Sequence, residues 1–474
     1  MERAWQKDLS KSERIKRMIL NPIRAGEPVT TQVDLLDRLE GSQYKVKGRR
    51  SETPQEKVAR EIVQLAADVS ESLLRFGAGA REVETALIAV TGAYGLKHVD
   101  MDINYQAANI NYSPPGEIPY NLLRVTRYWS DNYLGLVRIY ELVQDIIEHK
   151  VSVTEARDRI RFINRSPKPY ARWFVNLALG LFYFCSVITL GGTLFSAAAA
   201  FVISSIVSIM IRQMNKVHLP ELYSISISVT VISVLAGISS YIGVPMSPSL
   251  IIASGVLSLL PTMGLVSAVR DTITGYPVTA SARSLTVFLT FTGIVAGISI
   301  GLVIIDLVNL NPIDVTQTFQ GPNFVLHIFL TGFAAVCYAI SKQTARRTLM
   351  PVAACAMCGY ITFYLMTSIN IGPRLAPAIA AVVIGILARI FSTSLEVPSI
   401  VIFLPAMINL LPGMSILRAT YNLTTGVSSS AGGITDLASA IMVAVGLAAG
   451  VVLGDFLGQP LESKLKFGKP PKAQ

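Results

Sequence analysis

Charged side chains are scarce over most of this 474-residue chain, and their scarcity excludes a wholly soluble protein. Residues 1–172 hold 27 of the 41 Lys and Arg residues and 23 of the 31 Asp and Glu residues. From Trp173 onward the chain has only 14 basic and 8 acidic residues. A soluble domain needs a surface of which about 25–35% is charged, and this stretch cannot supply it. We therefore predict that it lies in a membrane.

Cysteines are also few, and all four lie in apolar segments, so they indicate neither a disulfide framework nor an oxidising compartment. They are Cys185, Cys337, Cys355 and Cys358. Cys355 and Cys358 have CxxC spacing, but no second pair or nearby His completes a metal site. We interpret them as small buried residues and expect no metal.

The N-terminus is basic but lacks the apolar run of a secretory signal, so the first 170 residues are predicted to stay in the cytoplasm. Their basic residues alternate with almost as many carboxylates, which argues against nucleic-acid binding. The sequence also lacks a G-x-S-x-G elbow, a phosphate loop and a zinc-hydrolase helix. It therefore predicts no cofactor.

What the chain does have is a series of low-charge runs, each about as long as the 20 helical residues that cross ~30 Å of hydrocarbon. They are 174–190, 193–211, 222–242, 248–268, 285–305, 324–340, 349–369, 375–391, 398–417 and 437–457. If the N-terminus is inside, twelve Lys and Arg residues lie in inner loops or the tail, and only Arg374 and Arg418 lie outside. This matches the positive-inside rule and predicts that both termini are cytoplasmic.

An internal repeat relates the two halves of the membrane part. LLPTMGLVSAVRDTITG (259–275) returns as LLPGMSILRATYNLTTG (410–426), with Leu, Leu, Pro, Met, Thr and Gly in register. Each half has five segments, and because five is odd, the second half enters the membrane from the opposite side. The predicted fold is mostly α: a polytopic membrane protein with ten transmembrane helices in two inverted five-helix repeats, plus a small cytoplasmic α+β N-terminal domain. Such repeats are typical of alternating-access transporters.

The predicted domain boundaries follow from these patterns. They are a mobile polar tail (1–55), a cytoplasmic α+β domain (56–165), helices 1–5 (173–308), helices 6–10 (324–457) and a basic cytoplasmic tail (458–474). Within the second, two helical patterns divide at Gly77 to Gly79, KHVDMDINYQAANINYS predicts a β-hairpin, and helical patterns resume at about 130–148 and 153–164.

Pro261 and Pro412 interrupt the fourth and ninth segments, where a missing N–H and a ring clash open a helix at a cost of about 3 kcal/mol. Broken helices expose backbone groups and helix ends that can hold small charged substrates in a shielded cavity. A packing kink is the alternative. The other predicted substrate-binding or gating residues are Arg270, Asp271, Thr274, Thr279, Ser281, Arg283, Asn409, Arg418 and Tyr421.

Each of these groups has a structural alternative. Arg270 and Asp271 can pair with each other while the hydroxyls cap the fifth helix, and Arg418 can reach the outer interface instead of gating. The candidates for proton coupling are Asp271, Asp306, Glu396 and Asp455; all are interpreted as loop or helix-end residues, with Asp271 the first choice. His98, Asp100 and Asp102 share a strand face, which predicts either a metal or acid–base site or an exposed polar face.

Five runs together resemble the bacterial threonine/serine exporter family. They are AYGLKHVDMDIN (93–104), PSLIIASGV (248–256), DTITGYPVTASAR (271–283), GIVAGISIGL (293–302) and LPGMSILRATY (411–421). The resemblance spans about 56–460. It implies a cytoplasmic-membrane transporter, not an enzyme, which exports L-threonine and L-serine with the proton motive force.

Other functions stay open. Leu417 and Pro261 depart from the family's pattern, and similar two-chain relatives are associated with dicarboxylate export, so another small carboxylate is an alternative substrate. A membrane-anchored hydrolase acting through residues 56–165 and a channel are further alternatives. The expected partners are threonine, serine, protons and the lipid bilayer, with no nucleic acid, and self-association is left open.

Overall fold

The computed structural model describes residues 53–115, 119–127, 129–239, 245–308, 313–315, 321–372, 374–425 and 430–467. Residues from Lys57 onward form one compact unit. The predicted N-terminal tail (1–55) and the end of the predicted C-terminal tail lie almost wholly outside the described residues.

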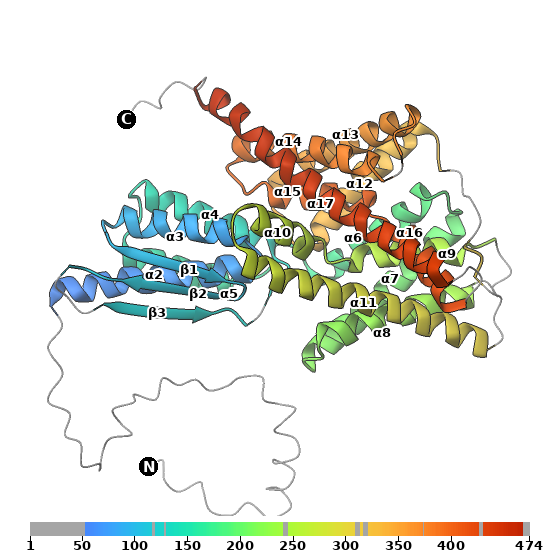
Figure 1. Cartoon of the computed structure of the whole chain (residues 1–474), viewed down its shortest axis with the longest axis horizontal. Helices are drawn as coiled ribbons and strands as arrows, with labels where there is room; N and C mark the ends of the chain where they lie inside the picture. Colours follow the sequence, from blue (N-terminus) through green and yellow to red (C-terminus); the bar gives the residue numbers. More distant parts are fainter. Residues whose placement is uncertain are drawn as a thin grey trace, which may run out of the picture. The chain divides into compact units, whose positions relative to one another are not determined.

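The N-terminal region combines helices with a small sheet (Figure 1). Its elements are α2 (Pro54–Arg75), α3 (Ala80–Ala93), β1 (Val99–Asn104), β2 (Ala107–Tyr112), β3 (Tyr120–Val125), α4 (Tyr133–Ile147) and α5 (Val153–Arg165). A capping box starts α2, since Thr53 Oγ1 accepts from Glu56 N (3.2 Å) and Glu56 Oε2 accepts from Thr53 N (2.7 Å). Because α2 ends at Arg75 and α3 begins at Ala80, the predicted division of the first two helices at Gly77 to Gly79 is confirmed.

The predicted hairpin is also confirmed, because β1 and β2 pair antiparallel with Val99 opposite Tyr112. The sheet has the order β1-β2-β3, and β3 was not predicted. Its sequence, YNLLRV, places two leucines side by side and so lacks a clean alternation. Ala108 and Ile110 of the central strand are buried, which fixes the register of the sheet against its helices.

The rest of the chain is helical. The elements are α6 (Arg172–Thr189), α7 (Leu194–Lys216), α8 (Glu221–Ser239), α9 (Pro248–Leu259), α10 (Thr262–Ile273), α11 (Pro277–Leu307), α12 (Phe324–Ser341), η3 (Arg346–Thr348), α13 (Leu349–Ser368), α14 (Ala376–Leu395), α15 (Ile400–Ala406), η4 (Ile408–Leu410), α16 (Gly413–Thr425) and α17 (Ser430–Phe467). Among the helices described, eight are long and apolar enough to cross a membrane, and two bent pairs raise this to as many as ten. A mostly helical, polytopic membrane protein is thus confirmed.

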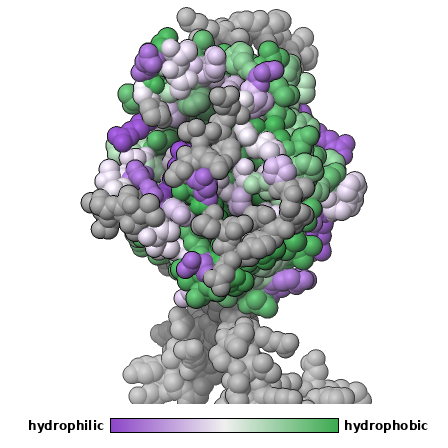
Figure 2. Space-filling model, turned by 90° about the vertical axis from the view of Figure 1, so that its right-hand side faces the viewer, coloured by the Kyte–Doolittle hydropathy of each residue, from purple (hydrophilic) through white to green (hydrophobic). Residues whose placement is uncertain are grey.

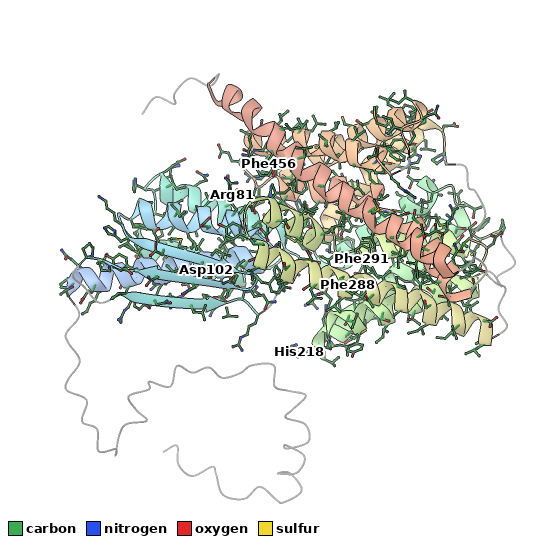
Figure 3. All side chains as sticks on the ribbon, viewed as in Figure 1. Arg81, Asp102, His218, Phe288, Phe291 and Phe456 are labelled. Atoms are coloured by element: carbon green, nitrogen blue, oxygen red, sulfur yellow. The ribbon has the colours of Figure 1, made fainter. Side chains whose placement is uncertain are left out.

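These helices expose many large apolar side chains, as lipid contact requires. Figure 2 shows one face on which apolar residues lie among polar ones. On α11, Phe288 is 62% exposed whereas Phe291, three residues later, is buried (Figure 3). Apolar side chains therefore face both the protein interior and its surroundings, as expected for a helix in a bilayer.

Glycines bring pairs of these helices into close contact. α11 packs on α8 through Gly293, Gly297 and Gly301, and a Cβ on Gly297 would lie 2.5 Å from the carbonyl oxygen of Ser226. α17 packs on α14 in the same way, with Gly450 against the carbonyl of Ala378. These glycine runs are packing faces, because small residues let the two backbones approach closely.

Candidate functional site at the helix breaks

Both bent helices break at the predicted prolines. α9 and α10 meet at 49° around Pro261, and the segment Ile400–Leu410 meets α16 at 51° around Pro412. After each proline the chain turns tightly: Thr262 N donates to Leu260 O (2.8 Å), and Gly413 N donates to Leu411 O (2.9 Å). The predicted helix openings are confirmed, because a proline cannot donate the backbone hydrogen bond that would continue the helix.

The two broken helices touch each other. α16 packs against α9, and a Cβ on Gly413 would lie 2.8 Å from Ala253 O. Near the second break, Asn409 donates from Nδ2 to Thr331 O on α12 (3.2 Å). Asn409 Oδ1 and Thr331 Oγ1 are buried without a hydrogen-bond partner among the residues described. Unpaired buried polar atoms are costly, so this pair offers acceptor capacity to a bound polar group.

Arg270, near the end of α10, joins three parts of the chain. Its guanidinium bonds to Glu82 of α3 and to Asp455 of α17. The Arg270 and Asp455 side chains are 9% and 5% exposed. The Arg270–Asp455 pair is therefore shielded from water, and charges interact more strongly there than at a surface. Glu82, the other partner, is 35% exposed.

Asp271, the next residue, is fully buried and makes different contacts. Its Oδ2 lies 3.1 Å from Arg283 Nε on α11, and its Oδ1 accepts from Ala80 N (3.0 Å). Ala80 is the first residue of α3, so the carboxylate sits at the positive end of that helix. Arg283 Nη2 in turn donates to Ala78 O (3.0 Å). The loop Gly77–Ala80 is thus held by two buried charges of the membrane helices.

Hydroxyl groups extend this contact. Thr279 Oγ1 accepts from Tyr105 N and donates to Ile103 O, both at 3.1 Å. Tyr105 Oη lies 2.9 Å from Thr286 Oγ1, and Tyr276 donates to Glu84. Burial, together with Glu84, raises the pKa of Tyr276, so its phenol keeps the proton that it donates. We call these contacts, with the ion pairs of Arg270, Asp271 and Arg283, the ion-pair network.

The structure contradicts part of the predicted arrangement. Arg270 and Asp271 do not pair with each other, because consecutive side chains on a helix point in different directions. Thr274 and Ser281 do not cap α11; they bond to Arg270 O (2.9 Å) and Pro277 O (2.7 Å) within one turn. α11 begins with Pro277 and has no side-chain cap.

The predicted residues of the second half have other partners, which lie outside the ion-pair network. Arg418 Nε donates to Val315 O (2.9 Å), and Tyr421 is half-buried against the apolar core. Asn422, next to Tyr421, donates to the exposed Asp436 (3.1 Å). The residues predicted from the sequence therefore fall into two separate groups, one near each broken helix.

The candidates for proton coupling also separate. Asp306 is exposed near the end of α11, and Glu396 caps α14 with a left-handed φ of 54°. Both are helix-end residues, as predicted. Asp455 is not: it lies inside α17, is 3% exposed, and has Arg389 Nη1 at 3.8 Å in addition to Arg270. The prediction was wrong because α17 runs to Phe467, ten residues beyond the predicted segment.

Sequence reasoning missed Glu82 and Glu84, which supply the acidic partners from α3. Glu82 stands in the first turn of α3, where an acidic residue is expected for helix capping alone. Nothing in its local sequence indicates a partner 188 residues away.

Of the two alternatives for His98, Asp100 and Asp102, the structure favours an exposed polar surface over a metal or acid–base site. His98 precedes β1 with a φ of 62°, so it does not share the strand's alternation. Asp100 and Asp102 are exposed, and Asp102 accepts from Asn104 (2.7 Å; Asp102 is labelled in Figure 3). No group of three His, Cys, Asp or Glu residues within the described ranges is arranged to hold a metal ion.

Two family models match consecutive parts of this chain. Residues 64–305 match a family model described as "Putative threonine/serine exporter", and residues 327–457 match one described as "Threonine/Serine exporter, ThrE". Together the two matches contain Glu82, Arg270, Asp271, Arg283 and Asp455.

Two curated relatives are similar to this chain over most of its length. The chain is 27% identical over 427 residues to the "Probable threonine/serine exporter" of Mycobacterium tuberculosis, covering 88% of this chain and 80% of that protein. It is 27% identical over 415 residues to the "Threonine/serine exporter" of Corynebacterium glutamicum, covering 86% and 84%. A shorter match, 27% over 230 residues, is to the "Probable succinate transporter subunit YjjP" of Klebsiella aerogenes, covering 47% and 86%. No solved structure matches the chain significantly.

Proposed function

Because the chain belongs to the threonine/serine exporter family, we propose that it exports L-threonine and L-serine across the bacterial cytoplasmic membrane by alternating access, driven by the proton motive force. Membership makes it a transporter and not an enzyme, and its apolar helices make it a multi-pass membrane protein. The observation that carries the mechanism is the buried ion-pair network beside the first broken helix.

Two inverted repeats are part of the proposal, and helix packing supports them. In each half the third helix packs on the fifth through glycines: α8 on α11, and α14 on α17. The second part of each broken helix packs on the last helix of the other half: α10 on α17, and α16 on α11. This pairing is expected for two copies of one five-helix unit in which the broken helix of each copy packs against the last helix of the other.

The ends of the two repeats differ in chemistry, which suggests two unequal gates. At positions 151 residues after Arg270, Asp271 and Arg283 stand Tyr421, Asn422 and Ile434. Where α16 meets α11, the contact is a neutral one between Thr424 Oγ1 and Ser299 Oγ (2.8 Å). In the proposed topology the ion-pair network closes the cytoplasmic end together with the N-terminal region, and the weaker neutral contact closes the outer end.

The substrate is proposed to bind between the two breaks. An amino acid carries a carboxylate, which suits the backbone N–H groups at the starts of α10 and α16. Its ammonium group needs acceptors, and Asn409 Oδ1 and Thr331 Oγ1 are buried and unpaired near the second break. Pro261 and Pro412 hold both helix starts open, while Arg418 and Tyr421 lie on α16 nearer the outer gate.

Asp271 is the proposed proton-coupling residue. Protonation would remove the negative charge that faces both Arg283 and the N-terminus of α3. The loop Gly77–Ala80 would then lose its carboxylate contact, which favours opening of the cytoplasmic gate. Thr274, Thr279 and Ser281 lie in the same connection, and of these Thr279 contacts the N-terminal region directly.

Counterflow in reconstituted vesicles tests the proposed function. Vesicles loaded with unlabelled L-threonine should accumulate labelled L-threonine transiently, and unlabelled L-serine should compete, because a carrier exchanges its substrate across the membrane. A pH gradient should drive net efflux in the wild type but not in Asp271→Asn, whereas Asp436→Asn, an exposed aspartate, should behave as the wild type.

Two outcomes would contradict the proposal. Flux without trans-stimulation would indicate a channel. Exchange of succinate but not threonine would favour a dicarboxylate carrier, the candidate that the match to the succinate transporter subunit supports.

A further inference from the structure

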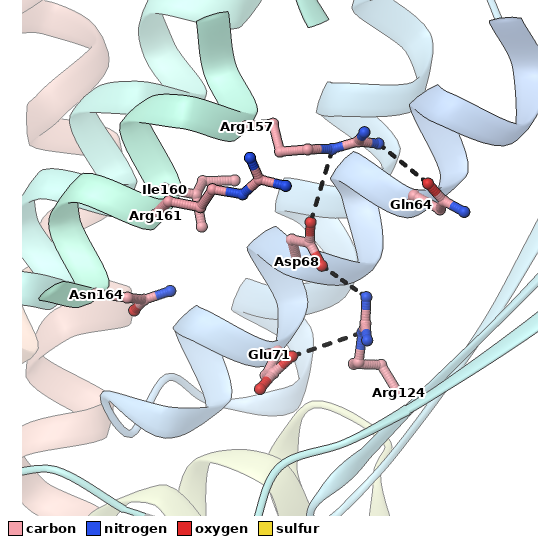
Figure 4. A pocket seen from close by; sticks show the side chains of 8 residues that line it. All are labelled: Gln64, Asp68, Glu71, Arg124, Arg157, Ile160, Arg161 and Asn164. Carbon is pink, nitrogen blue, oxygen red and sulfur yellow. Dashed lines mark hydrogen bonds and ion pairs between the residues drawn. The ribbon is translucent and has the colours of Figure 1, made fainter. Parts of the chain in front are cut away.

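A charged pocket of about 450 Å³ lies in the N-terminal region, between α2, β3 and α5 (Figure 4). Its volume is within the range of about 300–1,000 Å³ that small-molecule sites occupy. It is built from elements other than the broken helices, and neither the ion-pair network nor the proposed transport path uses it.

Acidic groups of the pocket come from α2 and face a cation on β3. Asp68 Oδ1 lies 2.7 Å from Arg124 Nη2, and Glu71 Oε2 lies 3.5 Å from Arg124 Nε. Asp68 Oδ2 lies 4.0 Å from Arg157 Nε, which is an ion pair at the limit of contact. Arg124 therefore neutralises only part of the negative charge on this wall.

Cationic groups line the opposite wall, on α5. Figure 4 shows the guanidinium groups of Arg157 and Arg161 pointing into the pocket from neighbouring turns. Arg157 Nη2 donates to Glu61 O (3.1 Å) and to Gln64 Oε1 (3.3 Å) on α2. Arg157 Nε is buried without a hydrogen-bond partner among the residues described, and so is Asn164 Oδ1, on the same helix. Arg161, whose side chain is 66% exposed, pairs with the exposed Asp158 at 3.5 Å. Within the described residues, this wall therefore keeps the Nε donor of Arg157, the exposed guanidinium of Arg161 and one acceptor, Asn164 Oδ1, for a ligand.

From these charges we propose that the pocket binds a small zwitterionic amino acid. Arg157 and Arg161 hold the carboxylate, as guanidinium groups do well. Asp68, Glu71 and Asn164 Oδ1 receive the ammonium group. A dicarboxylate would satisfy the arginines but would place its second negative charge against Asp68 and Glu71. The charge of the walls thus selects a ligand with both signs.

The pocket is connected to the ion-pair network through α2. Asp68 and Glu71 lie on the last two turns of this helix, which ends at Arg75. The loop Gly77–Ala80 follows directly and contacts Arg283 and Asp271. An amino acid that orders the end of α2 therefore acts on the loop at the proposed gate, which makes the pocket a sensor site.

Hydrogen exchange of the full chain in lipid nanodiscs tests this site. With L-threonine present, peptides from α2 and α5 should exchange several-fold more slowly than without it, and succinate should protect them much less. The variant Arg157→Ala with Arg161→Ala should lose the protection. Arg159→Ala is the matched control: it removes an arginine from the same helix that pairs with Asp145 and Glu155 outside the pocket.

Exchange in α4 shows whether the double variant is folded; if it is not, Arg161→Ala alone replaces it. Equal protection by succinate, or protection that survives in the folded variant, would overturn the inference, because the signal would then come from another site. The pocket does not depend on what the membrane helices carry. Protection by threonine in a protein that fails to exchange threonine across vesicles would refute the proposed function and leave this site standing.

Discussion

At the scale of single residues, Arg270 and Asp271 show how neighbours on a helix take different roles. Arg270 binds carboxylates of α3 and α17, whereas Asp271 binds Arg283 and the start of α3. Asp271 and Arg283 are almost completely buried. A buried charge is tolerated only when it is paired, so each of the two depends on the other.

We expect Asp271→Asn to reduce the free energy of unfolding by about 3–5 kcal/mol, because Arg283 keeps its charge in a buried position without the carboxylate that neutralises it. Arg283→Met combined with Asp271→Asn should recover part of this loss, since both charges are then absent. Thermal unfolding in detergent, followed by circular dichroism, measures both. Asp436→Asn serves as the exposed control, and a double variant no more stable than Asp271→Asn would show that the pair is not coupled.

At the scale of elements, close contact between helices depends on particular glycines. Gly450 of α17 faces the carbonyl of Ala378 on α14, so an added methyl group has no space there. Gly446, one turn earlier, would bring a Cβ to 3.6 Å from Ala378 Cβ, which is an ordinary contact. Two glycines on the same helix face thus differ in what they permit.

Gly450→Ala should therefore destabilise the protein by about 1–3 kcal/mol through overpacking, whereas Gly446→Ala should be nearly neutral. Melting temperatures of the two purified variants, compared with the wild type, decide this. If both variants lost the same stability, helix flexibility would be the cause, and contact with Ala378 would not.

The N-terminal region also contacts the membrane helices at a second place, the end of α12. Tyr133 N donates to Lys342 O (3.1 Å) and Leu134 N to Gln343 O (3.0 Å). Lys342 Nζ lies 2.6 Å from Asp131 Oδ2, and its positive charge lowers the pKa of that carboxyl. Two backbone bonds and one ion pair therefore fix the start of α4 here.

This ion pair should make the contact sensitive to acid. Because the folded pKa of Asp131 is below its ordinary value of about 3.9, the stabilisation is complete above that value and is lost as the pH falls through the lower folded pKa. Its size should be at most about 1 kcal/mol, since Asp131 is 64% exposed. Melting temperatures from pH 7 downward should fall less in Asp131→Asn than in the wild type. Asp158→Asn, on the exposed side of α5, should follow the wild type.

At the scale of the whole molecule, the N-terminal region and the membrane helices are held together by buried charges at the proposed cytoplasmic gate. Arg270, Asp271 and Arg283 each contact both the N-terminal region and another membrane helix. Opening this gate requires these contacts to separate together. The described conformation is therefore one in which the proposed cytoplasmic entrance is closed.

A cysteine at Ser267 should report that closure. Ser267 lies on α10 one turn before Arg270 and is 1% exposed. In a background without the four native cysteines, Ser267→Cys should react slowly with a membrane-impermeant thiol reagent added to the cytoplasmic face. Adding Arg270→Met should speed the reaction, because Glu82 and Asp455 lose their shared partner. Equal rates in both proteins would argue against a gate formed by Arg270.

Much of the fold could be predicted because its causes are local. Apolar runs of sufficient length located the membrane helices, Pro261 and Pro412 located the two bends, and alternation located the first hairpin. β3 was not predicted because its sequence lacks a clean alternation of apolar and polar residues. The end of α17 was predicted too early because charged residues continue the helix beyond its apolar run. The direction in which the second half inserts stays a prediction.

The candidate site was predictable only in part. Arg270, Asp271, Thr279 and Arg283 stood out as polar residues in an apolar context, and the structure brings all four to the N-terminal region. Their partners did not stand out, because Glu82 and Glu84 lie in a charged helix where acidic residues are ordinary. Asp455 was noticed, but its burial among helices could not be foreseen.

The sequence by itself determined which segments are apolar, where prolines break them and which polar residues interrupt them, since these properties depend on residues a few positions apart. Only the tertiary structure decided which charges meet. Arg270 and Glu82 are separated by 188 residues and Arg270 and Asp455 by 185, and such a pairing depends on how whole helices pack against one another. Packing is a property of complete surfaces, which no short stretch of sequence contains.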